Sequence, residues 1–435
     1  MPKLRILAEF AAARWMRPLR TRKAVERRQR RLLRRQLRFL RANSPYFAGR
    51  IHEDATSLDG LPLMDKPLMM AHFDELNTVS ASREEAMALA LANERSRDFA
   101  HDLGDVAVGL SSGTSGHRGM FLVSKAEREQ WAGTVLARAL PRGRILGHRV
   151  ALFLRADNTL YETVASRVVS FRYFDVFGDM DAHMDALTAY RPTILVAPPS
   201  ILLRLADAAR EGRLQGPYPQ KVYSVAEVLE VSDARRIATA LGQPRIHQIY
   251  QCTEGFLAYT CPQGTIHLNE DTLIFEREEL GDGRFVPIIT DLRRRAQPIV
   301  RYRLGDILRR RADPCPCGSA LQAIERIEGR TGDTLRLPSV TDPVSTVPVY
   351  ADLVSRAMVY AEGFRDYRVE QTGPVRIEVA LDTDDPSALR SVSAELHALA
   401  DRMGARRPEL VFVPFRHDPA TKLRRVMRSW NGGEP

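Results

Sequence analysis

The chain has 435 residues, of which 44% are hydrophobic and 27% are charged. This composition is typical of globular proteins, and the length suffices for a large domain and a smaller one. No run of about 20 apolar residues occurs, so no membrane span is expected. The N-terminus has neither the apolar core nor the cleavage site of a secretory signal. We therefore expect a cytoplasmic protein.

The formal net charge is +10, and much of it lies between Arg14 and Arg41. In this stretch Leu33, Leu37 and Leu40 fall on one face of a helix. Such a helix can present its arginines to nucleic acid or to an anionic membrane. It can also dock on the main domain by its apolar face and leave the arginines in solvent. We favour docking, because no nucleic-acid-binding motif accompanies the helix, and nucleic acid is not an expected partner.

Residues 1–105 are mostly helical by their pattern, and Ser44-Pro45 ends the first long helix. Short apolar strands then alternate with helices, which predicts a layered α/β domain. The expected strands are 106–108, 150–154, 193–197, 222–225 and 246–250, and the expected helices are 200–211 and 232–241, the second capped by Ser232 or Asp233.

From about residue 260 the pattern changes to β structure, with strands expected at 264–268, 273–275 and 286–290. After Gly329 the chain has the pattern of a small α+β unit, with strands at 367–371 and 376–381 and a helix at 387–403. The expected fold class is therefore α/β in the large part of the chain and α+β in the small part.

A loop rich in glycine and hydroxyl residues follows the apolar segment 106–108. It reads Ser111-Ser112-Gly113-Thr114-Ser115-Gly116-His117-Arg118-Gly119. Its glycines let the backbone approach a polyphosphate, and its hydroxyls, N–H groups and Arg118 supply hydrogen bonds and charge. No Lys-Ser/Thr pair closes the loop, so it is not the common nucleotide loop. From the loop alone, a phosphate cradle and a flexible turn are equally good interpretations.

Four further segments carry candidate chemistry: Tyr250-Gln251-Cys252-Thr253-Glu254-Gly255, 299–306, 327–333 and 418–425. In the first, an aromatic ring, a hydroxyl and a carboxylate can stack a base, contact a phosphate and hold Mg²⁺. In the second, Asp306 follows a glycine turn and suits a ribose diol. Each segment alone is typical of a strand end, a turn or a solvated tail. The order of all five segments favours nucleotide chemistry.

This ordered set, from Ser111 to Lys422, resembles the adenylate-forming superfamily of acyl-CoA ligases, luciferases and adenylation domains. It is most similar to the phenylacetate-CoA ligase branch and its coenzyme F synthetase-related relatives, on the basis of Ser44-Pro45-Tyr46, Tyr302-Arg303 ahead of Gly305-Asp306, and Cys315-Pro316-Cys317-Gly318. The resemblance implies a large multi-layer N-terminal adenylation domain and a small mobile α+β C-terminal domain. The implied parts are a helical portion at 1–105, the ATP- and substrate-binding core at 106–330, and the small domain at 331–435.

The resemblance also implies ATP and Mg²⁺ as cofactors and assigns the nucleotide contacts. The implied ATP-binding residues are Ser111, Ser112, Gly113, Thr114, Ser115, Gly116 and Arg118 for the β- and γ-phosphates, Ala226, Glu227 and Tyr250 for adenine, and Asp306 for the ribose. The implied catalytic residues are Thr253 at the α-phosphate, Glu254 as the Mg²⁺ ligand, Arg330 near the phosphates at the hinge, and Lys422 at the substrate carboxylate. Gly332 or Asp333 is the implied pivot, where the family more often has two acidic residues.

The implied reaction is ATP-dependent activation of a carboxylic acid as an acyl-adenylate, followed by thioester formation with CoA or a carrier-protein phosphopantetheine. Two alternatives stay open. The adenylyl group could pass to a cofactor hydroxyl or the adenylate to an amine, or the chain could be a non-catalytic nucleotide- or nucleic-acid-binding protein. The joint presence of Glu254, Asp306 and Lys422 argues against lost catalysis. The candidate partners are a small carboxylic acid, aromatic by family preference, an acyl carrier protein and a second copy of the chain.

Two short pairs of metal-ligating residues flank turns on either side of the β region. They are Cys261 with His267 and Cys315 with Cys317, whereas the fourth cysteine, Cys252, lies inside the nucleotide motif. A Cys₃His set is typical of a closed, structural zinc site, and related ligases with a Cys-Pro-Cys-Gly element resemble the chain here. The alternative is a core histidine beside unpaired buried cysteines. We favour zinc.

Overall fold

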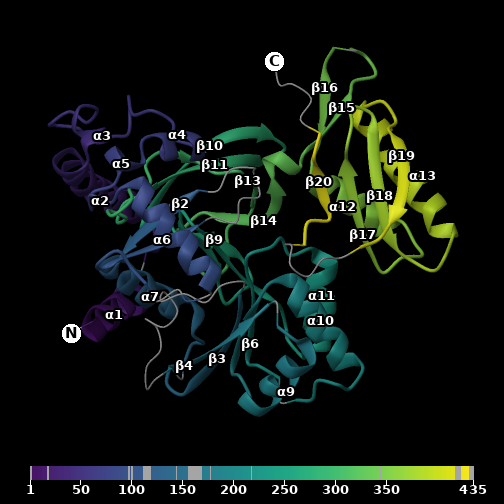
Figure 1. Ribbon diagram of the computed structural model, residues 1–435, viewed down its shortest axis with the longest axis horizontal. Helices are drawn as coiled ribbons and strands as arrows, with labels where there is room; N and C mark the ends of the chain where they lie inside the picture. The colour runs from purple at the N-terminus through teal and green to yellow at the C-terminus, as the bar shows by residue number, and fades with distance from the viewer. Residues whose placement is uncertain are drawn as a thin grey trace. The chain divides into compact units, whose positions relative to one another are not determined.

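The computed structural model of the chain describes residues 2–16, 19–96, 98, 101–110, 119–143, 145–154, 169–176, 178–216, 218–342, 344–416 and 423–430. The chain divides into two compact units (Figure 1). The larger unit comprises Met1–Leu304 and Arg310–Glu325, and the smaller comprises Gly305–Arg309 and Arg326–Pro435. Within the residues described, no helix combines the length and the apolar character needed to cross a membrane.

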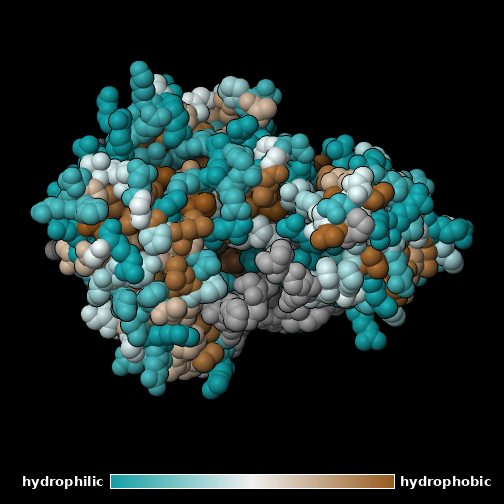
Figure 2. All heavy atoms as spheres, turned by 90° about the horizontal axis from the view of Figure 1, so that it is seen from above, coloured by the Kyte–Doolittle hydropathy of each residue, from teal (hydrophilic) through white to brown (hydrophobic). Residues whose placement is uncertain are grey.

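The N-terminal part of the larger unit is mostly helical, as its sequence predicts. Its elements are α1 (Pro2–Ala11), the π-helical turn η1 (Ala12–Met16), α2 (Arg22–Asn43), α3 (Pro45–Ala48), α4 (Lys66–Ala71), α5 (Phe73–Leu76) and α6 (Arg83–Ser96). Helix α2 docks by its apolar face, since Leu33, Leu37 and Leu40 are buried. The preference for docking is thereby confirmed. In Figure 2 hydrophilic side chains cover most of the visible surface of the described residues.

A mixed sheet forms the centre of the larger unit. Its strands include β3 (His148–Leu154), β4 (Val169–Asp175), β5 (Ile194–Ala197), β6 (Lys221–Ser224), β7 (His247–Cys252), β8 (Gly255–Thr260) and β9 (Ile266–Leu268). They lie in the order β9-β8-β7-β6-β5-β3-β4. Strands β3 to β7 pair in parallel, whereas β8 and β9 continue the sheet antiparallel. Parallel strands joined by helices confirm the α/β expectation for this region.

Helix α7 (Lys125–Ala139) precedes the parallel strands. The helices that connect parallel strands are α9 (Met180–Tyr190), α10 (Pro199–Arg210) and α11 (Val231–Ala240). The predicted cap of α11 at Ser232 or Asp233 is wrong. The backbone is extended at Glu230, which is the N-cap and makes no side-chain cap bond, so both predicted caps already lie in the first turn.

Antiparallel strands complete the larger unit. They are β1 (Val106–Leu110), β2 (Met120–Ser124), β10 (Leu273–Gly281), β11 (Arg284–Asp291) and β12 (Tyr302–Arg303). Strands β1 and β2 form a hairpin, and β10 and β11 form another. The change from an α/β to a β pattern after residue 260 is therefore confirmed.

Helix α1 packs tightly across α7 at Gly133. A Cβ atom at Gly133 would lie 2.6 Å from the carbonyl oxygen of Ile6 and 2.8 Å from Cβ of Glu9. Arg14 extends this contact, since its guanidinium donates to the carbonyls of Ala137 and Leu140 at the end of α7. A cation that binds the last carbonyls of a helix also opposes the helix dipole favourably. The N-terminal segment therefore holds α7 along its length.

We expect Gly133→Ala to destabilise the larger unit. The added methyl group meets backbone atoms of α1, and overpacking of this kind typically costs about 1–3 kcal/mol, more than the gain of about 1 kcal/mol from replacing glycine in a helix. The free energy of unfolding measured with urea should fall. Gly216→Ala is the matched control, because a Cβ there meets only an ordinary contact at 3.6 Å. Equal stability of both variants would contradict the tight α1–α7 contact.

The smaller unit has its own sheet and core. Its elements are β13 (Asp306–Arg310) and β14 (Ala323–Arg330), which carry the chain across the boundary between the two units, then η2 (Thr331–Asp333), β15 (Leu335–Pro338), β16 (Thr346–Val349), α12 (Ala351–Tyr360), β17 (Asp366–Gln371), β18 (Arg376–Asp382), α13 (Ser387–Met403), β19 (Glu409–Pro414) and β20 (Val426–Arg428). The sheet order is β19-β18-β17-β20. Apolar residues of α12, α13, β17 and β18 share one buried cluster. The expected α+β character is confirmed.

Candidate functional site

The predicted phosphate loop connects the two strands of the β1-β2 hairpin. The register pairs Leu110 with Met120, so the two ends of the loop lie side by side. The predicted phosphate ligands Ser111, Ser112, Gly113, Thr114, Ser115, Gly116 and Arg118 lie outside the described residues. Gly119, at the end of the loop, lies against the side chain of Lys66, since a Cβ on Gly119 would be 3.2 Å from Cδ of Lys66. Lys66 is a cation beside the loop that the sequence analysis missed.

Thr253 and Glu254 form the two-residue turn of the β7-β8 hairpin, in which Cys252 pairs with Gly255. The Thr253 hydroxyl donates to the Glu254 carboxylate over 2.9 Å. The carbonyl of Thr253 accepts from the Arg294 guanidinium over 2.5 Å. The turn therefore projects a hydroxyl and a carboxylate from the carboxyl end of a parallel strand, where open α/β sheets commonly bind ligands.

Tyr302 is a buried residue close to the Glu254 carboxylate. Burial and the negative charge of Glu254 raise the pKa of Tyr302 above its ordinary value. The hydroxyl therefore stays protonated. The backbone on both sides of Tyr302 is hydrogen-bonded to Met64. The Met64 N–H donates to the Arg301 carbonyl over 2.9 Å, and the Arg303 N–H donates to the Met64 carbonyl over 2.8 Å. These backbone bonds fix the position of Tyr302 close to Glu254.

The predicted adenine segment follows strand β6. Ala226 is exposed and has a φ of +66°, a left-handed conformation that is rare for residues other than glycine. The carboxylate of the following residue, Glu227, accepts a hydrogen bond from the backbone N–H of Ser200, at the start of α10, over 3.1 Å. The predicted adenine partner Tyr250 is a buried residue of β7, close in sequence to the Thr253-Glu254 turn. Ala226 and Thr253 line the same cavity.

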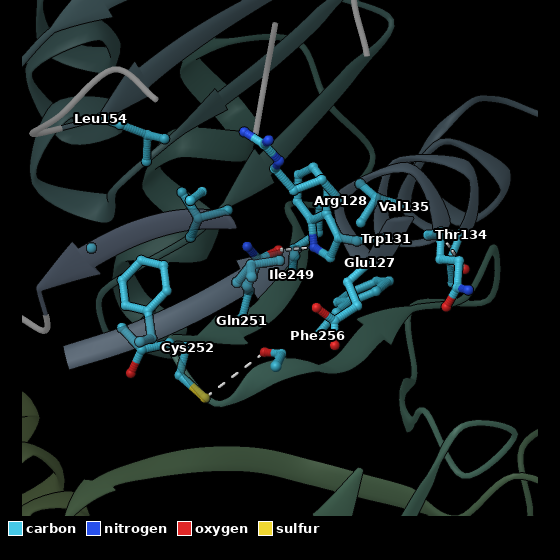
Figure 3. A pocket seen from close by; sticks show the side chains of 18 of the residues that line it. Glu127, Arg128, Trp131, Thr134, Val135, Leu154, Ile249, Gln251, Cys252 and Phe256 are labelled. Atoms are coloured by element: carbon cyan, nitrogen blue, oxygen red, sulfur yellow. Dashed lines mark hydrogen bonds between the residues drawn. The ribbon is translucent and has the colours of Figure 1, made fainter. Parts of the chain in front are cut away.

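This cavity, of about 450 Å³, lies between α7 and the sheet (Figure 3). Near its polar end, Trp131 Nε1 donates to Oε1 of Gln251 over 3.1 Å. Close by, the Arg128 guanidinium contacts Asp102 over 2.7 Å. Trp131 could not be predicted from the sequence as a site residue, because a single tryptophan in a helix carries no signal that separates a cavity wall from a core residue.

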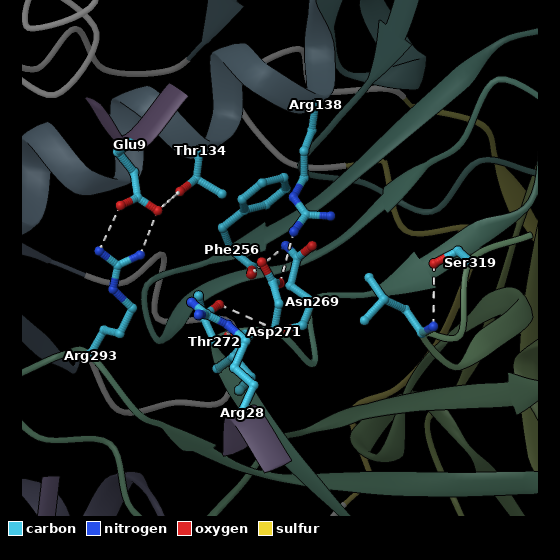
Figure 4. Close-up of polar contacts among 12 residues, drawn as sticks. Glu9, Arg28, Thr134, Arg138, Phe256, Asn269, Asp271, Thr272, Arg293 and Ser319 are labelled. Atoms are coloured by element: carbon cyan, nitrogen blue, oxygen red, sulfur yellow. Dashed lines mark hydrogen bonds and ion pairs between the residues drawn. The ribbon is translucent and has the colours of Figure 1, made fainter. Parts of the chain in front are cut away.

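A group of largely buried polar contacts joins elements that border the cavity (Figure 4). The Arg293 guanidinium binds both carboxylate oxygens of Glu9, over 2.6 and 3.0 Å. The Thr134 hydroxyl of α7 also contacts Glu9. Asp291 accepts from the backbone N–H groups of Arg293 and Arg294, yet desolvation by burial raises the pKa of its carboxyl group. These contacts connect helix α1, helix α7 and the end of β11 in one network.

The smaller unit contains the remaining predicted catalytic residues. The Arg330 guanidinium lies 3.6 Å from the carboxylate of Asp306, so the implied phosphate and ribose ligands are neighbours there. Asp333, the candidate pivot, forms a buried ion pair with Arg424. Burial raises the pKa of Asp333, while Arg424 and Arg330 oppose that rise. Lys422 itself lies outside the described residues.

The four predicted metal ligands converge in the larger unit. The ligand atoms of Cys261, His267, Cys315 and Cys317 all lie within 4.8 Å of one another. The Cys261 and Cys315 sulfurs are 3.7 Å apart, and Cys317 Sγ is 3.4 Å from His267 Nε2. Ligands of a tetrahedral Zn²⁺ with usual bond lengths would be about 3.8 Å and about 3.6 Å apart for these two pairs. The distances between the ligand atoms therefore agree with those of a zinc site.

The second ring nitrogen of His267 also fits a metal ligand. His267 Nδ1 lies 3.0 Å from the carbonyl of Leu321, which can accept its proton. This bond leaves Nε2 free of a proton and directed to the cysteines, as ligating histidines usually are. Cys261 and Cys315 are buried, and His267 is fully buried. Such a closed set of four protein ligands leaves no open position, which is typical of a structural metal.

No protein-family model matches the sequence, and no curated protein matches it. Solved structures do match its fold. A 2-hydroxyisobutyryl-CoA ligase, in the postadenylation state in complex with R3-HIB-AMP, has a TM-score of 0.68 at 17% identity, over 94% of this chain and 89% of that one. An anthranilate-CoA ligase in complex with anthranoyl-AMP gives a TM-score of 0.51 at 13% identity, over 73% of this chain and 66% of that one. The amide bond synthetase McbA from Marinactinospora thermotolerans gives 0.54 at 15% identity, over 73% and 67%.

The chain therefore has the fold of the adenylate-forming enzymes, and the expected fold is confirmed. At these levels of identity the likeness concerns the fold, and function has to be argued from the site.

Proposed function

We propose that the chain is an ATP-dependent ligase that activates a carboxylic acid as an acyl-adenylate. The observation that carries the proposal is the Thr253-Glu254 turn at the rim of an apolar cavity of about 450 Å³. A hydroxyl and a carboxylate for the nucleotide and its metal thus lie next to a space for the acid. Solved enzymes of this fold in complex with R3-HIB-AMP and with anthranoyl-AMP support the same reading.

In this proposal an oxygen of the substrate carboxylate attacks the α-phosphorus of ATP. The bond between the α-phosphorus and its bridging oxygen breaks, pyrophosphate leaves, and a mixed anhydride of acid and AMP remains. Thr253 contacts the α-phosphate, Ala226, Glu227 and Tyr250 border the adenine, and Asp306 binds the ribose. The loop 111–118 holds the outer phosphates. Arg330 and Lys422 supply positive charge that opposes the repulsion between the two anions.

Glu254 is the proposed Mg²⁺ ligand, since a carboxylate oxygen suits this hard cation. Among the described hydrogen bonds, its carboxylate accepts from the neutral hydroxyl of Thr253 and from no side-chain cation. The ion supplies charge neutralisation at the phosphates when bound. The site residues fit that role.

A thiol or an amine is the proposed acceptor of the acyl group. The acceptor's sulfur or nitrogen attacks the acyl carbonyl, AMP leaves, and the acceptor loses a proton. We place CoA or a carrier-protein phosphopantetheine first, because a matching ligase is solved with 2-HIB-AMP and CoA. An amine is the second candidate, supported by the likeness to an amide bond synthetase. The family resemblance alone favours an aromatic acid, whereas the length of the cavity favours a longer apolar acid. A homodimer and a cytoplasmic setting complete the proposal.

We also propose that Cys261, His267, Cys315 and Cys317 bind a structural Zn²⁺. The separations of their ligand atoms and the His267 Nδ1 contact to a carbonyl support it. The ion would hold the 261–267 turn against the 315–317 turn. Three reduced cysteines in one cluster also fit a reducing compartment.

Acid-dependent release of pyrophosphate from ATP tests the proposed reaction. The purified protein with Mg²⁺ is assayed against a panel of fatty, aryl and amino acids, and then with CoA, a carrier protein and simple amines. We expect at least one acid class to release pyrophosphate and to exchange labelled pyrophosphate into ATP. If the protein binds ATP but no acid in the panel supports exchange, carboxylate adenylation is wrong.

A further inference from the structure

The cavity beside the Thr253-Glu254 turn is lined by elements of the larger unit. One wall is α7, and the opposite wall is made of the parallel strands β3, β5 and β7 (Figure 3). Alternate residues of a strand face the same side, and Val150, Leu152 and Leu154 of β3 accordingly all line it. The wall formed by the sheet is therefore a continuous apolar surface along the strands.

Helix α7 crosses these strands from their carboxyl ends to their amino ends. Midway along the helix, Trp131 contacts Gln251, close to the carboxyl end of β7, over 3.1 Å. At its last residue, the carbonyl of Ala139 accepts from the Tyr223 hydroxyl of β6 over 2.6 Å. Lys221, the first residue of β6, also reaches this carbonyl, over 3.4 Å. The end of α7 thus lies at the opposite edge of the sheet from the proposed nucleotide site.

The cavity follows α7 over this whole distance. Its lining extends from Glu127 to Ala139 along the helix and from Leu154 back to Val150 along β3. The four residue steps from Val150 to Leu154 correspond to about 13 Å. The cavity therefore extends over about this length, and we call its end at Thr253 the mouth and its end near Ala139 the floor.

The chemistry of the walls changes with depth. The polar side chains of the lining are engaged with other groups: Arg128 binds Asp102 and Trp131 binds Gln251. Further along α7, Thr134 contacts Glu9, which is also the partner of Arg293. The described residues that line the floor are apolar, namely Leu136, Ala139, Leu140, Val150, Phe171 and Ile194. A polar or charged group on the deep part of a ligand would lose its hydration among these apolar residues. The polar side chains near this end, those of Tyr223 and Lys221, are not part of the lining and already bind the Ala139 carbonyl. The floor selects against such groups.

We propose that the activated acid carries an extended, uncharged apolar tail, about as long as a chain of eight to ten carbons, which fills the cavity to its floor. This rests on the proposed function, which places the carboxylate at Thr253. A single aromatic ring would fill only the upper part and leave the floor empty, and empty apolar space is unfavourable. Amino acids and hydroxy acids with polar tails are excluded by the same floor.

A series of straight-chain acids, from about two to about sixteen carbons, tests the tail length. We expect kcat/KM for pyrophosphate release to rise about three- to fourfold per added methylene, to reach a maximum near eight to ten carbons, and then to fall. Benzoate and phenylacetate should react much more slowly than the best chain. Equal rates for short and long chains, or a clear preference for single-ring or amino acids, would overturn the inference and leave adenylation itself standing.

Two substitutions at different depths test where the tail lies. Val135→Phe blocks the cavity part-way down α7, and Ala139→Phe blocks its floor. The preferred chain should shorten by more carbons in the first variant than in the second. Ala126→Phe is the matched control, since Ala126 is on the same helix outside the cavity lining, and its preference should equal that of the unmodified chain. If a variant fails to fold, the chain-length series on the unmodified protein still decides.

Direct binding separates this inference from the proposed reaction. Decanoate should displace a fluorescent fatty-acid probe from the full-length protein in the absence of ATP, and Ala139→Phe should weaken this displacement at least about tenfold, whereas Ala126→Phe should not. Binding without any pyrophosphate release would sustain the acyl cavity and reject adenylation. Pyrophosphate release with other acids and no decanoate binding would do the reverse.

Discussion

Glu254→Gln should reduce acid-dependent pyrophosphate release by about 10²–10³-fold, the size of effect seen when one charge-stabilising group is lost at a transition state. The substitution keeps the shape of the side chain, so the hydroxyl of Thr253 can still donate to its oxygen. What it removes is the negative charge proposed to hold Mg²⁺. The Mg²⁺ concentration for half-maximal rate should therefore rise as well, and a titration of Mg²⁺ at saturating ATP measures it.

Two controls separate the charge of Glu254 from its structural role. Tyr302→Phe removes the hydroxyl close to the carboxylate and leaves the charge of Glu254, so the rate should fall far less than in Glu254→Gln. Glu211→Gln removes a carboxylate that pairs with Arg213 on the surface, and the rate should not change. An unchanged rate and Mg²⁺ dependence in Glu254→Gln would remove Glu254 from the proposed mechanism.

Most of the fold could be predicted from short sequence patterns. Short apolar segments bounded by turns located β5, β6 and β7, and the helix expected at 387–403 has those bounds in the structure. Helix caps were harder, as Glu230 shows, because it caps α11 by backbone geometry alone. A residue without a capping side chain leaves no mark in the sequence.

The parts of the site that escaped prediction depend on contacts between distant segments. Lys66 lies against Gly119, and Arg294 contacts Thr253. Neither residue stands in a recognisable motif, so only the folded chain brings them to the turn. The same holds for Glu9, whose pair with Arg293 joins the first helix to the network behind the cavity. The metal ligands were predictable, because two close pairs of cysteine and histidine are themselves a sequence pattern.

Replacing one metal ligand should destabilise the larger unit strongly. We expect Cys261→Ala to abolish zinc binding and to lower the free energy of unfolding by more than about 4 kcal/mol, because loss of a structural metal is among the few single changes with so large an effect. The three ligands that remain would surround a space without its ion, and the turns at 261–267 and 315–317 would lose their link. Metal analysis and urea unfolding of the same preparation measure the two effects.

Cys252→Ala is the matched control for this prediction. Cys252 is half-buried and makes a contact with Gly255 O over 3.8 Å, outside the Cys261 cluster. Its loss should leave zinc content and stability close to those of the unmodified chain. Thiol titration adds a second readout: with zinc bound, only Cys252 should react readily, and the other three cysteines should react once a chelator has removed the metal. If purification without chelator yields no zinc and Cys261→Ala is as stable as Cys252→Ala, then His267 and its three cysteines are ordinary core residues.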